Sequence, residues 1–135
     1  KGKVKAGVSD ALVSQIDWYA SFANLVGYKL KKDEAPDSKN NLKSLFGTET
    51  KNREFVVEQN LNNVLGIVVG NWKYIEPSKF GKMNKDTNTE LGNDIRPQLY
   101  NLRTDPGETN NLAAEYPEKV IELRSKLNEI KLSKK

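Results

Sequence analysis

The side chains available for chemistry in this chain are amines, guanidinium groups, carboxylates, hydroxyls and amides, because it contains no cysteine and no histidine. The missing cysteine excludes disulfides, thiolate metal sites and a thiol nucleophile. The missing histidine removes the side chain best suited to proton transfer near neutral pH. The sequence also has no Walker-type glycine loop, no zinc-ligand spacing and no nucleophile beside a plausible base. We therefore predict neither a catalytic site nor a metal site within this chain.

Two pairs of carboxylates require an interpretation. Glu54 and Glu58 stand at even spacing on one face of a predicted strand, where two acids usually mark a solvated face. Asp105 and Glu108 bracket a predicted turn. We interpret this second pair as turn hydrogen-bond partners and as favourable charge near a helix start, rather than as acid–base groups.

The positive charge is spread along the chain. The net charge is +4, with extra lysines at both ends. A nucleic-acid footprint needs basic residues gathered on one face, usually with aromatic stacking positions among them. Because no such interleaving occurs, a small basic nucleic-acid binder is the weakest of the functional hypotheses.

The polar stretch 77–97 carries cations without a clear periodicity, among them Lys79, Lys82 and Arg96. Loops of this length inside a compact domain are commonly functional or mobile. We therefore single out these three cations as candidate binding residues for an anionic ligand.

A helix is predicted over residues 15–26. Ser14 can cap it, Asp17 occupies the capping-box position, and Gly27 follows the last apolar residue as a stop. Apolar residues go nearly all the way round this helix, so it must be buried on most sides. Either it is sandwiched within this domain, or its main partner lies outside this chain.

The segments on either side of this helix are less regular. Val4, Ala6 and Val8 alternate with lysines, which indicates a short strand or an extended arm. Residues 28–52 are polar and form a predicted connector with one helical turn near 42–46.

The remaining residues predict an α+β fold in which a small antiparallel sheet packs against a C-terminal helix. Strands are expected at 53–59, 64–69, 72–76 and 98–102. The turns between the first three are Asn60 to Asn63 and the two-residue hairpin loop Gly70-Asn71. We divide the chain accordingly into a first part, 1–52, and a second part, 53–135.

The strand at 98–102 has Leu and Tyr on opposite faces, as expected where a sheet is covered on both sides. Asp105-Pro106-Gly107 then forms a turn, with glycine at the position where a type II turn demands positive φ. A final helix is predicted over 117–131, with one apolar face on the sheet. That face consists of Val120, Leu123, Leu127 and Ile130, with Ile121 beside them.

No stretch of the sequence approaches the roughly 20 apolar residues of a membrane span. The chain does not open like a signal peptide, because no apolar run follows its first lysines. It also lacks an initiating methionine, which indicates that it begins inside a longer protein.

A set of short motifs follows in order over nearly the whole chain. They are Gly2-Lys3-Val4, Val13-Ser14-Gln15-Ile16-Asp17, Leu25-Val26-Gly27, Gly70-Asn71-Trp72-Lys73-Tyr74-Ile75, Leu99-Tyr100-Asn101-Leu102, Asp105-Pro106-Gly107-Glu108 and Asn110-Asn111-Leu112-Ala113. Taken in this order, the motifs resemble the C-terminal signature of the type I sulfatases, the formylglycine-dependent, arylsulfatase-like enzymes of the alkaline phosphatase superfamily. Departures occur at Ala20-Ser21, where the family often has Pro-Thr, and at Asp37-Ser38, where it often has Asp-Gly.

The resemblance implies that residues 1–52 end the α/β core of a sulfatase and that 53–135 form its C-terminal subdomain. The family's formylglycine precursor, calcium ligands and catalytic residues would lie upstream of Lys1, so none is carried over to this chain. The chain alone is then expected to be inactive, with the missing N-terminal core as its partner. The resemblance implies that the parent is a periplasmic, secreted or lysosomal enzyme. Because no N-glycosylation site occurs despite abundant asparagine, we expect a bacterial periplasmic or secreted enzyme rather than a glycosylated lysosomal one.

In such a parent, Lys79, Lys82 and Arg96 would be available to a sulfated small molecule or saccharide. The alternative from another class is a non-enzymatic module that binds a partner protein through the apolar helix and the sheet. Neither reading includes a nucleic acid or a membrane.

Overall fold

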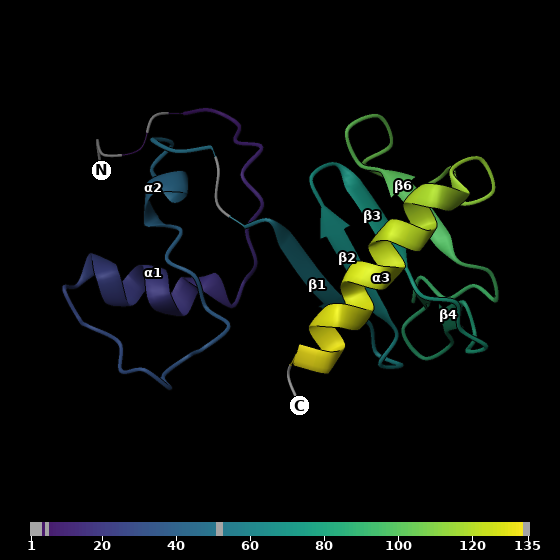
Figure 1. Cartoon of the computed structure of the whole chain (residues 1–135), viewed down its shortest axis with the longest axis horizontal. Coiled ribbons are helices and arrows are strands. Elements are labelled where there is room, and N and C mark those ends of the chain that lie inside the picture. The colour runs from purple at the N-terminus through teal and green to yellow at the C-terminus, as the bar shows by residue number, and fades with distance from the viewer. Residues whose placement is uncertain (1–3, 5, 51–52, 134–135) are drawn as a thin grey trace. The chain divides into compact units, whose positions relative to one another are not determined.

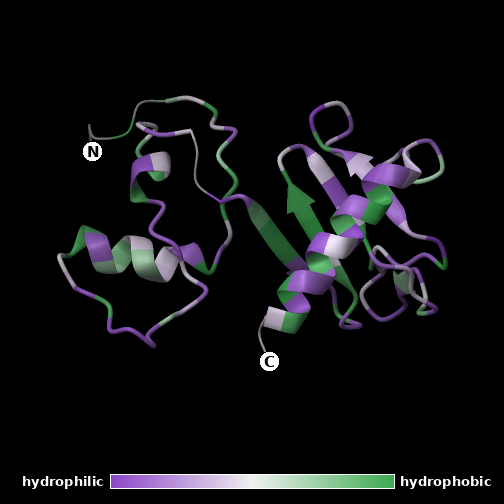
Figure 2. Cartoon of the chain, in the orientation of Figure 1, coloured by the Kyte–Doolittle hydropathy of each residue, from purple (hydrophilic) through white to green (hydrophobic). Residues whose placement is uncertain are grey.

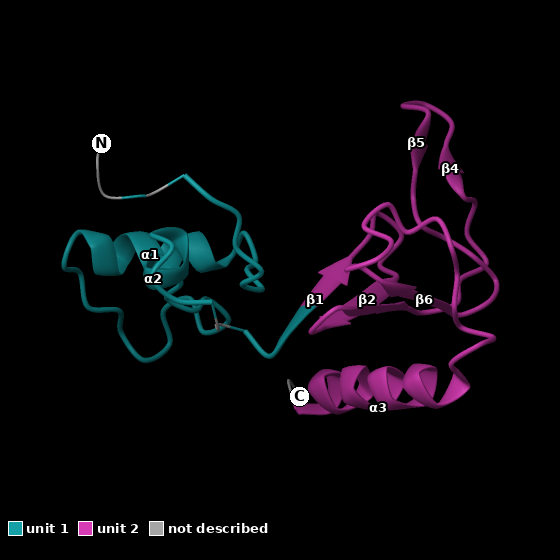
Figure 3. Ribbon diagram, turned by 90° about the horizontal axis from the view of Figure 1, so that it is seen from above, with its two compact units in different colours: residues 1–56 teal, residues 57–135 magenta. Residues whose placement is uncertain are grey.

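A computed structural model describes residues 4, 6–50 and 53–133. It divides into two compact units, residues 1–56 and 57–135, which are described separately (Figures 1 and 3). The fold is α+β, as predicted from the sequence. The division between the units falls inside strand β1 (Phe55–Gln59), whereas the predicted division of the parent's domains after residue 52 stays a prediction.

The first unit is built on helix α1 (Asp17–Leu25). Gly27 ends it with a φ of +77°, and the N–H groups of Gly27 and Tyr28 donate to the carbonyls of Asn24 and Ala23. These two bonds form a Schellman motif, so the predicted glycine stop is confirmed. The predicted Ser14 side-chain cap is wrong, because the N-cap residue is Ile16 and makes no side-chain capping bond. The predicted capping-box role of Asp17 is confirmed, because its Oδ2 accepts from the Ser14 N–H over 3.0 Å.

The burial of α1 is inverted relative to an ordinary amphipathic helix. Asp17, Ala20 and Ser21 are buried, whereas the rings of Trp18 and Phe22 are half exposed and stack with centroids 5.3 Å apart. The helix is therefore not sandwiched within the described part of unit 1.

The other segments of unit 1 are mostly irregular. The predicted helical turn is helix α2 (Leu42–Leu45), and Gly47 follows it with a φ of +72°. The predicted N-terminal strand is wrong for residues 4 and 6–16, which contain no strand, so the extended arm remains. Lys3 and Lys5 lie outside the described residues.

The second unit contains a four-stranded antiparallel sheet with the strand order β1-β2-β3-β6. Strand β2 (Leu65–Val69) and strand β3 (Trp72–Ile75) are joined by the predicted two-residue hairpin loop. Gly70 opens this loop with a φ of +57°, a value that glycine adopts without strain. Strand β6 (Gln98–Asn101) completes the sheet beside β3.

The core lies between the sheet and helix α3 (Pro117–Ser133), which covers one face (Figure 3). Ile67, Tyr74 and Leu99 are directly opposite one another on adjacent strands, and all three are fully buried. The helix contributes Val120, Leu123 and Leu127 to this core. Figure 2 shows that α3 carries both hydrophobic and hydrophilic residues along its length. Ile121, predicted to lie beside the apolar face of this helix, is exposed, because its position turns it away from the apolar stripe.

The predicted loop 77–97 contains a small hairpin made of β4 (Met83–Asn84) and β5 (Thr89–Glu90). This hairpin lies on the side of the sheet opposite α3 (Figure 3). The sequence did not predict it, because strands this short leave no periodic signal.

The predicted turn after β6 is confirmed, with one correction. The Glu108 N–H donates to the Asp105 carbonyl over 3.2 Å. The positive φ is at Glu108, +54°, and not at Gly107, so the turn is not type II. Asp105 bonds to the backbone N–H groups of Thr109 and Asn110, as predicted for a turn residue.

Candidate functional site

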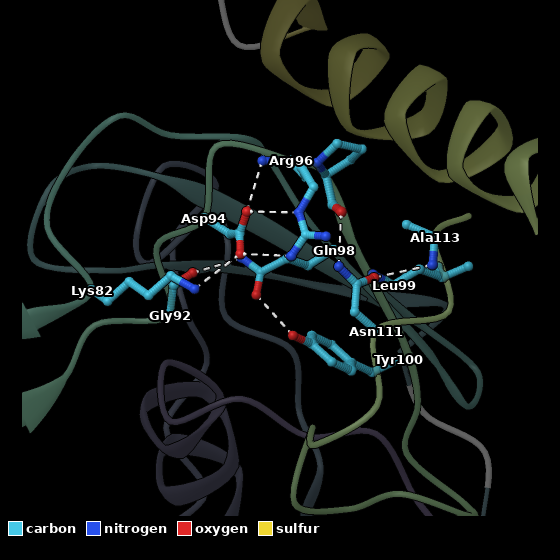
Figure 4. Close-up of polar contacts among 10 residues, drawn as sticks. Lys82, Gly92, Asp94, Arg96, Gln98, Leu99, Tyr100, Asn111 and Ala113 are labelled. Atoms are coloured by element: carbon cyan, nitrogen blue, oxygen red, sulfur yellow. Dashed lines mark hydrogen bonds and ion pairs between the residues drawn. The ribbon is translucent and has the colours of Figure 1, made fainter. Parts of the chain in front are cut away.

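Asp94 brings two of the three candidate cations together (Figure 4). Its Oδ2 lies 3.2 Å from the Nζ of Lys82, and its Oδ1 lies 3.2 Å from the Nε of Arg96. The backbone N–H of Arg96 also donates to Oδ1 over 2.9 Å. We call Lys82, Asp94 and Arg96 the Asp94 cluster.

The cluster carries one net positive charge. The hydrogen bonds from Arg96 are the main cause that holds the pKa of Asp94 well below its usual range, and the same contact raises the pKa of Arg96. The side chain of Asp94 is 12% exposed, whereas those of Lys82 and Arg96 are 67% and 72% exposed. The side chains of Lys82 and Arg96 are thus exposed to solvent, whereas the Asp94 carboxylate to which both bind is much less exposed.

Asn93 fixes the base of the loop that carries the cluster. It is buried, and its Nδ2 donates to the Asn62 side chain and to the Gly81 carbonyl, each over 2.9 Å. Its Oδ1 accepts from the Nδ2 of Asn60 over 2.8 Å. Because Asn60 and Asn62 belong to the turn between β1 and β2, this network attaches the loop to the sheet.

Strand β6 holds the other end of the loop through side-chain amides. Gln98 donates from Nε2 to the Gly92 carbonyl and accepts from the Tyr100 hydroxyl, each over 2.8 Å. Asn111 accepts from the backbone N–H of Leu99 and donates to the Pro97 carbonyl. A carboxylate at position 98 could not donate to the Gly92 carbonyl.

A cavity of about 170 Å³ lies beside the 77–97 loop and is lined there by Leu91 and Gly92. Lys73 lies in it, 2.9 Å from Glu58 and 2.8 Å from Glu108. Burial lowers the pKa of Lys73, but its hydrogen bonds to the two carboxylates outweigh this effect and raise the pKa overall. Glu58 therefore belongs to an ion-pair network, and Glu108 contacts Lys73 rather than a helix start.

Lys79, the third candidate cation, lies elsewhere. It lines a separate cavity together with Tyr74, Phe80 and Arg124. The structure thus brings together two of the residues singled out in the sequence and separates the third from them.

The Asp94 cluster can hold an anion through its cations, but it presents no nucleophile with a base. In the described ranges, 4, 6–50 and 53–133, no three acidic residues gather in a way that could hold a metal ion. Within those ranges, no helix is long and apolar enough to cross a membrane. The sequence reasoning missed Asp94, Asn93 and Gln98, although the Asp94–Arg96 spacing is one in which an aspartate side chain bonds the backbone two residues on.

No family model matches this chain. It is 50% identical to an N-acetylgalactosamine-6-O-sulfatase of Bacteroides thetaiotaomicron over 129 residues, which are 96% of this chain and 25% of that protein. A solved structure from the same organism, described in the context of glycosaminoglycan metabolism by a core genetic locus, superposes with a TM-score of 0.85 and 50% identity. It is matched over 96% of this chain and 27% of its own length.

A 2-O GAG sulfatase shares the fold, with a TM-score of 0.55 and 21% identity over 84% of this chain and 23% of its own. The chain thus spans about a quarter of the length of the proteins it matches. The resemblance to sulfatases that the sequence motifs indicated is confirmed by these matches.

Proposed function

We propose that this chain, the C-terminal portion of a sulfatase, completes an enzyme that hydrolyses the sulfate ester of a sugar. The observation that carries the proposal is the 50% identity with an N-acetylgalactosamine-6-O-sulfatase over 96% of the chain. We infer from that relative's name that the substrate is a 6-O-sulfated amino sugar, free or within a glycosaminoglycan.

The first role of the chain in such an enzyme is structural. Helix α1 exposes Trp18, Phe22 and Leu25 on one side, while its polar residues Asp17 and Ser21 are buried. Exposed apolar area of this kind is stabilised when another surface covers it. The rest of the sulfatase is the partner we propose for this side of α1, and it would stabilise the parent's fold by burying these rings.

The second role is substrate binding by the Asp94 cluster. A sulfate ester carries a negative charge and oxygen acceptors, which suit the planar donors of Arg96 and the ammonium group of Lys82. Asp94 orients Arg96 through a side-chain and a backbone hydrogen bond. A guanidinium held in this way loses less conformational freedom when it binds an anion.

The cofactors expected of the parent are calcium and a formylglycine nucleophile. The described residues of this chain do not fit a calcium site, because no group of three acidic side chains converges among them. The family resemblance implies that the formylglycine precursor lies upstream of Lys1. We therefore assign both to the remainder of the enzyme. A periplasmic or secreted bacterial location remains part of the proposal.

The experiment uses the full-length protein that contains this chain, purified beside the 135-residue chain alone. Both are incubated with N-acetylgalactosamine-6-sulfate and calcium, and free sulfate is measured. We expect sulfate release by the full-length protein only. The proposal would be contradicted if the full-length protein hydrolysed no sugar 6-sulfate and no aryl sulfate. Turnover by the 135-residue chain alone would also contradict it.

A further inference from the structure

A cavity of about 510 Å³ in unit 2 lies between helix α3, the turn before β2 and the loop after β3. We call it the Tyr74 pocket. The pocket is lined by the β1–β2 turn, the end of β3, the start of the 77–97 loop and two residues of α3. Its charged or amide residues are Asn62, Asn63, Glu76, Lys79, Arg124 and Asn128.

A buried hydroxyl group belongs to one of the residues that line the pocket. Tyr74 is fully buried, and its hydroxyl makes no hydrogen bond to the residues that the structure describes. Burial and the charge of Glu76 raise the pKa of this phenol against the opposing effect of Arg124, so it remains a donor at neutral pH. Buried hydroxyls in folded proteins nearly always have a partner. A group that enters the pocket can supply the missing acceptor.

The rim of the pocket carries cations that no carboxylate neutralises. Arg124 and Lys79 form no ion pair within the part of the chain that the structure describes. The carboxylate of Glu76, the pocket's acidic residue, is paired with Lys131. An anion that binds here would therefore meet two available cations.

The other groups of the pocket suit a polyhydroxylated ligand. Asn128 lies one helical turn after Arg124, so both side chains are on the same face of α3. Asn62 and Asn63 use their Oδ1 atoms within the protein, which leaves their amide N–H groups for a ligand. Phe80 is 57% exposed at the rim and offers an apolar ring on which the C–H face of a sugar can pack.

We propose that the Tyr74 pocket binds an anionic saccharide, with Arg124 and Lys79 on its sulfate or carboxylate group and the Tyr74 hydroxyl and asparagine amides on its hydroxyl oxygens. The pocket holds Lys79, the candidate cation that the Asp94 cluster leaves out. Only the choice of a sulfated sugar as the natural ligand rests on the proposed function. A glycosaminoglycan chain bound here would be retained while another of its residues is hydrolysed.

The test measures binding and hydrolysis separately in the full-length protein. A fluorescently labelled chondroitin sulfate hexasaccharide is titrated, and sulfate release is measured with the monosaccharide N-acetylgalactosamine-6-sulfate. The pocket variants are the double substitution Lys79→Ala with Arg124→Ala, and Tyr74→Phe, which removes the hydroxyl and keeps the ring. The matched control is Lys32→Ala with Arg103→Ala, which removes the same charge from exposed positions outside the pocket.

We expect the double pocket variant to bind the hexasaccharide at least ~10-fold more weakly and Tyr74→Phe about 3- to 10-fold more weakly. The control should change binding less than about 2-fold, and all variants should hydrolyse the monosaccharide like the wild type. Equal losses in the pocket and control pairs would overturn the proposal, because the binding would then depend on net charge alone. Unchanged binding by Tyr74→Phe, or equal competition by a single-stranded oligonucleotide, would also overturn it. A wild type that binds without hydrolysis would refute the proposed function and leave the pocket assignment standing.

Discussion

The guanidinium group of Arg53 forms a two-point ion pair with the carboxylate of Asp17, which is 36 residues earlier in the chain. The Arg53 Nε donates to the Asp17 Oδ2 over 2.6 Å, and its Nη2 donates to Oδ1. The backbone N–H groups of Ser14 and Lys39 and the amide of Asn41 complete the environment of Asp17. Asp17 thus joins the start of α1 to the connector that follows the helix.

The first prediction concerns the loss of this ion pair. The side chains of Arg53 and Asp17 are 9% and 3% exposed, so Asp17→Asn leaves a desolvated guanidinium without its counter-ion. We expect the free energy of unfolding of the full-length protein to fall by about 3–5 kcal/mol, measured by urea denaturation. Asp86→Asn, at an exposed position, is the control and should change it by less than about 0.5 kcal/mol. A loss of similar size in both variants would show that the ion pair is not the cause.

The second prediction concerns the pH dependence of stability. Burial opposes ionisation of Asp17, but the hydrogen bonds from Arg53, Lys39 and Ser14 outweigh it and lower the pKa of the carboxyl below its ordinary 3.8. The resulting stabilisation is fully present above the unfolded pKa and is lost as the pH falls through the folded pKa. The difference in stability between the wild type and Asp17→Asn should therefore be constant from about pH 5 to 7 and shrink below about pH 4. Thermal melts over this range test it, and a difference that is independent of pH would contradict it.

The third prediction concerns the glycine in strand β2. A Cβ at Gly66 would lie 3.1 Å from the Tyr74 carbonyl oxygen, which the paired strand holds in place. Gly66→Ala should lower the free energy of unfolding by about 1–3 kcal/mol through overpacking. Gly81→Ala is the matched control, because its nearest neighbour, the Met83 carbonyl oxygen, is 3.8 Å away. Chemical denaturation of both variants provides the comparison. Equal free energies of unfolding for the two variants would show that strands β2 and β3 accommodate the added methyl group without loss of stability.

The fourth prediction concerns the attachment of the 77–97 loop. Asn93→Ala removes the part-buried hydrogen bonds to Asn60, Asn62 and Gly81, whereas the Nδ2 of Asn60 keeps its bond to the Leu91 carbonyl. We expect faster hydrogen exchange across 82–92 and a loss of about 1–3 kcal/mol in stability. Thr87→Ala, at an exposed position of the same loop, should leave both unchanged. If exchange in the loop is the same in the two variants, the asparagine network does not hold it.

Much of the fold can be predicted from local chemistry. Gly27 and Gly70 both adopt positive φ where the sequence indicated a helix stop and a hairpin loop. The spacing of Val120, Leu123 and Leu127 identified the buried side of α3. These signals are local because each depends on the backbone freedom of one residue or on the period of one helix.

The features that could not be predicted depend on distant partners. The apolar pattern of α1 indicated burial on most sides, whereas Asp17 faces inward because Arg53 meets it from another segment. Asp94 carried no signal as the centre of a cluster, since Lys82 is 12 residues away and separated from it by the β4–β5 hairpin. Nothing in the sequence distinguishes the Tyr74 hydroxyl from an ordinary core group, and only the packed structure shows that it has no hydrogen-bond partner among the described residues.

The last prediction concerns substrate binding by the Asp94 cluster. Arg96→Ala removes the oriented guanidinium and Lys82→Ala the neighbouring ammonium, so each should raise KM for a sulfated saccharide about 3- to 10-fold. Because the described residues present no acid–base group beside the cluster, kcat should stay within about 2-fold of the wild type. Arg96→Lys keeps the charge but not the planar donors, so it should restore only part of the affinity. Lys85→Ala, which removes a cation from the same loop without a contact to Asp94, is the control. Equal KM values for all four variants and the wild type would exclude the cluster from the substrate site, whereas a loss in kcat alone would place it in the chemistry rather than in binding.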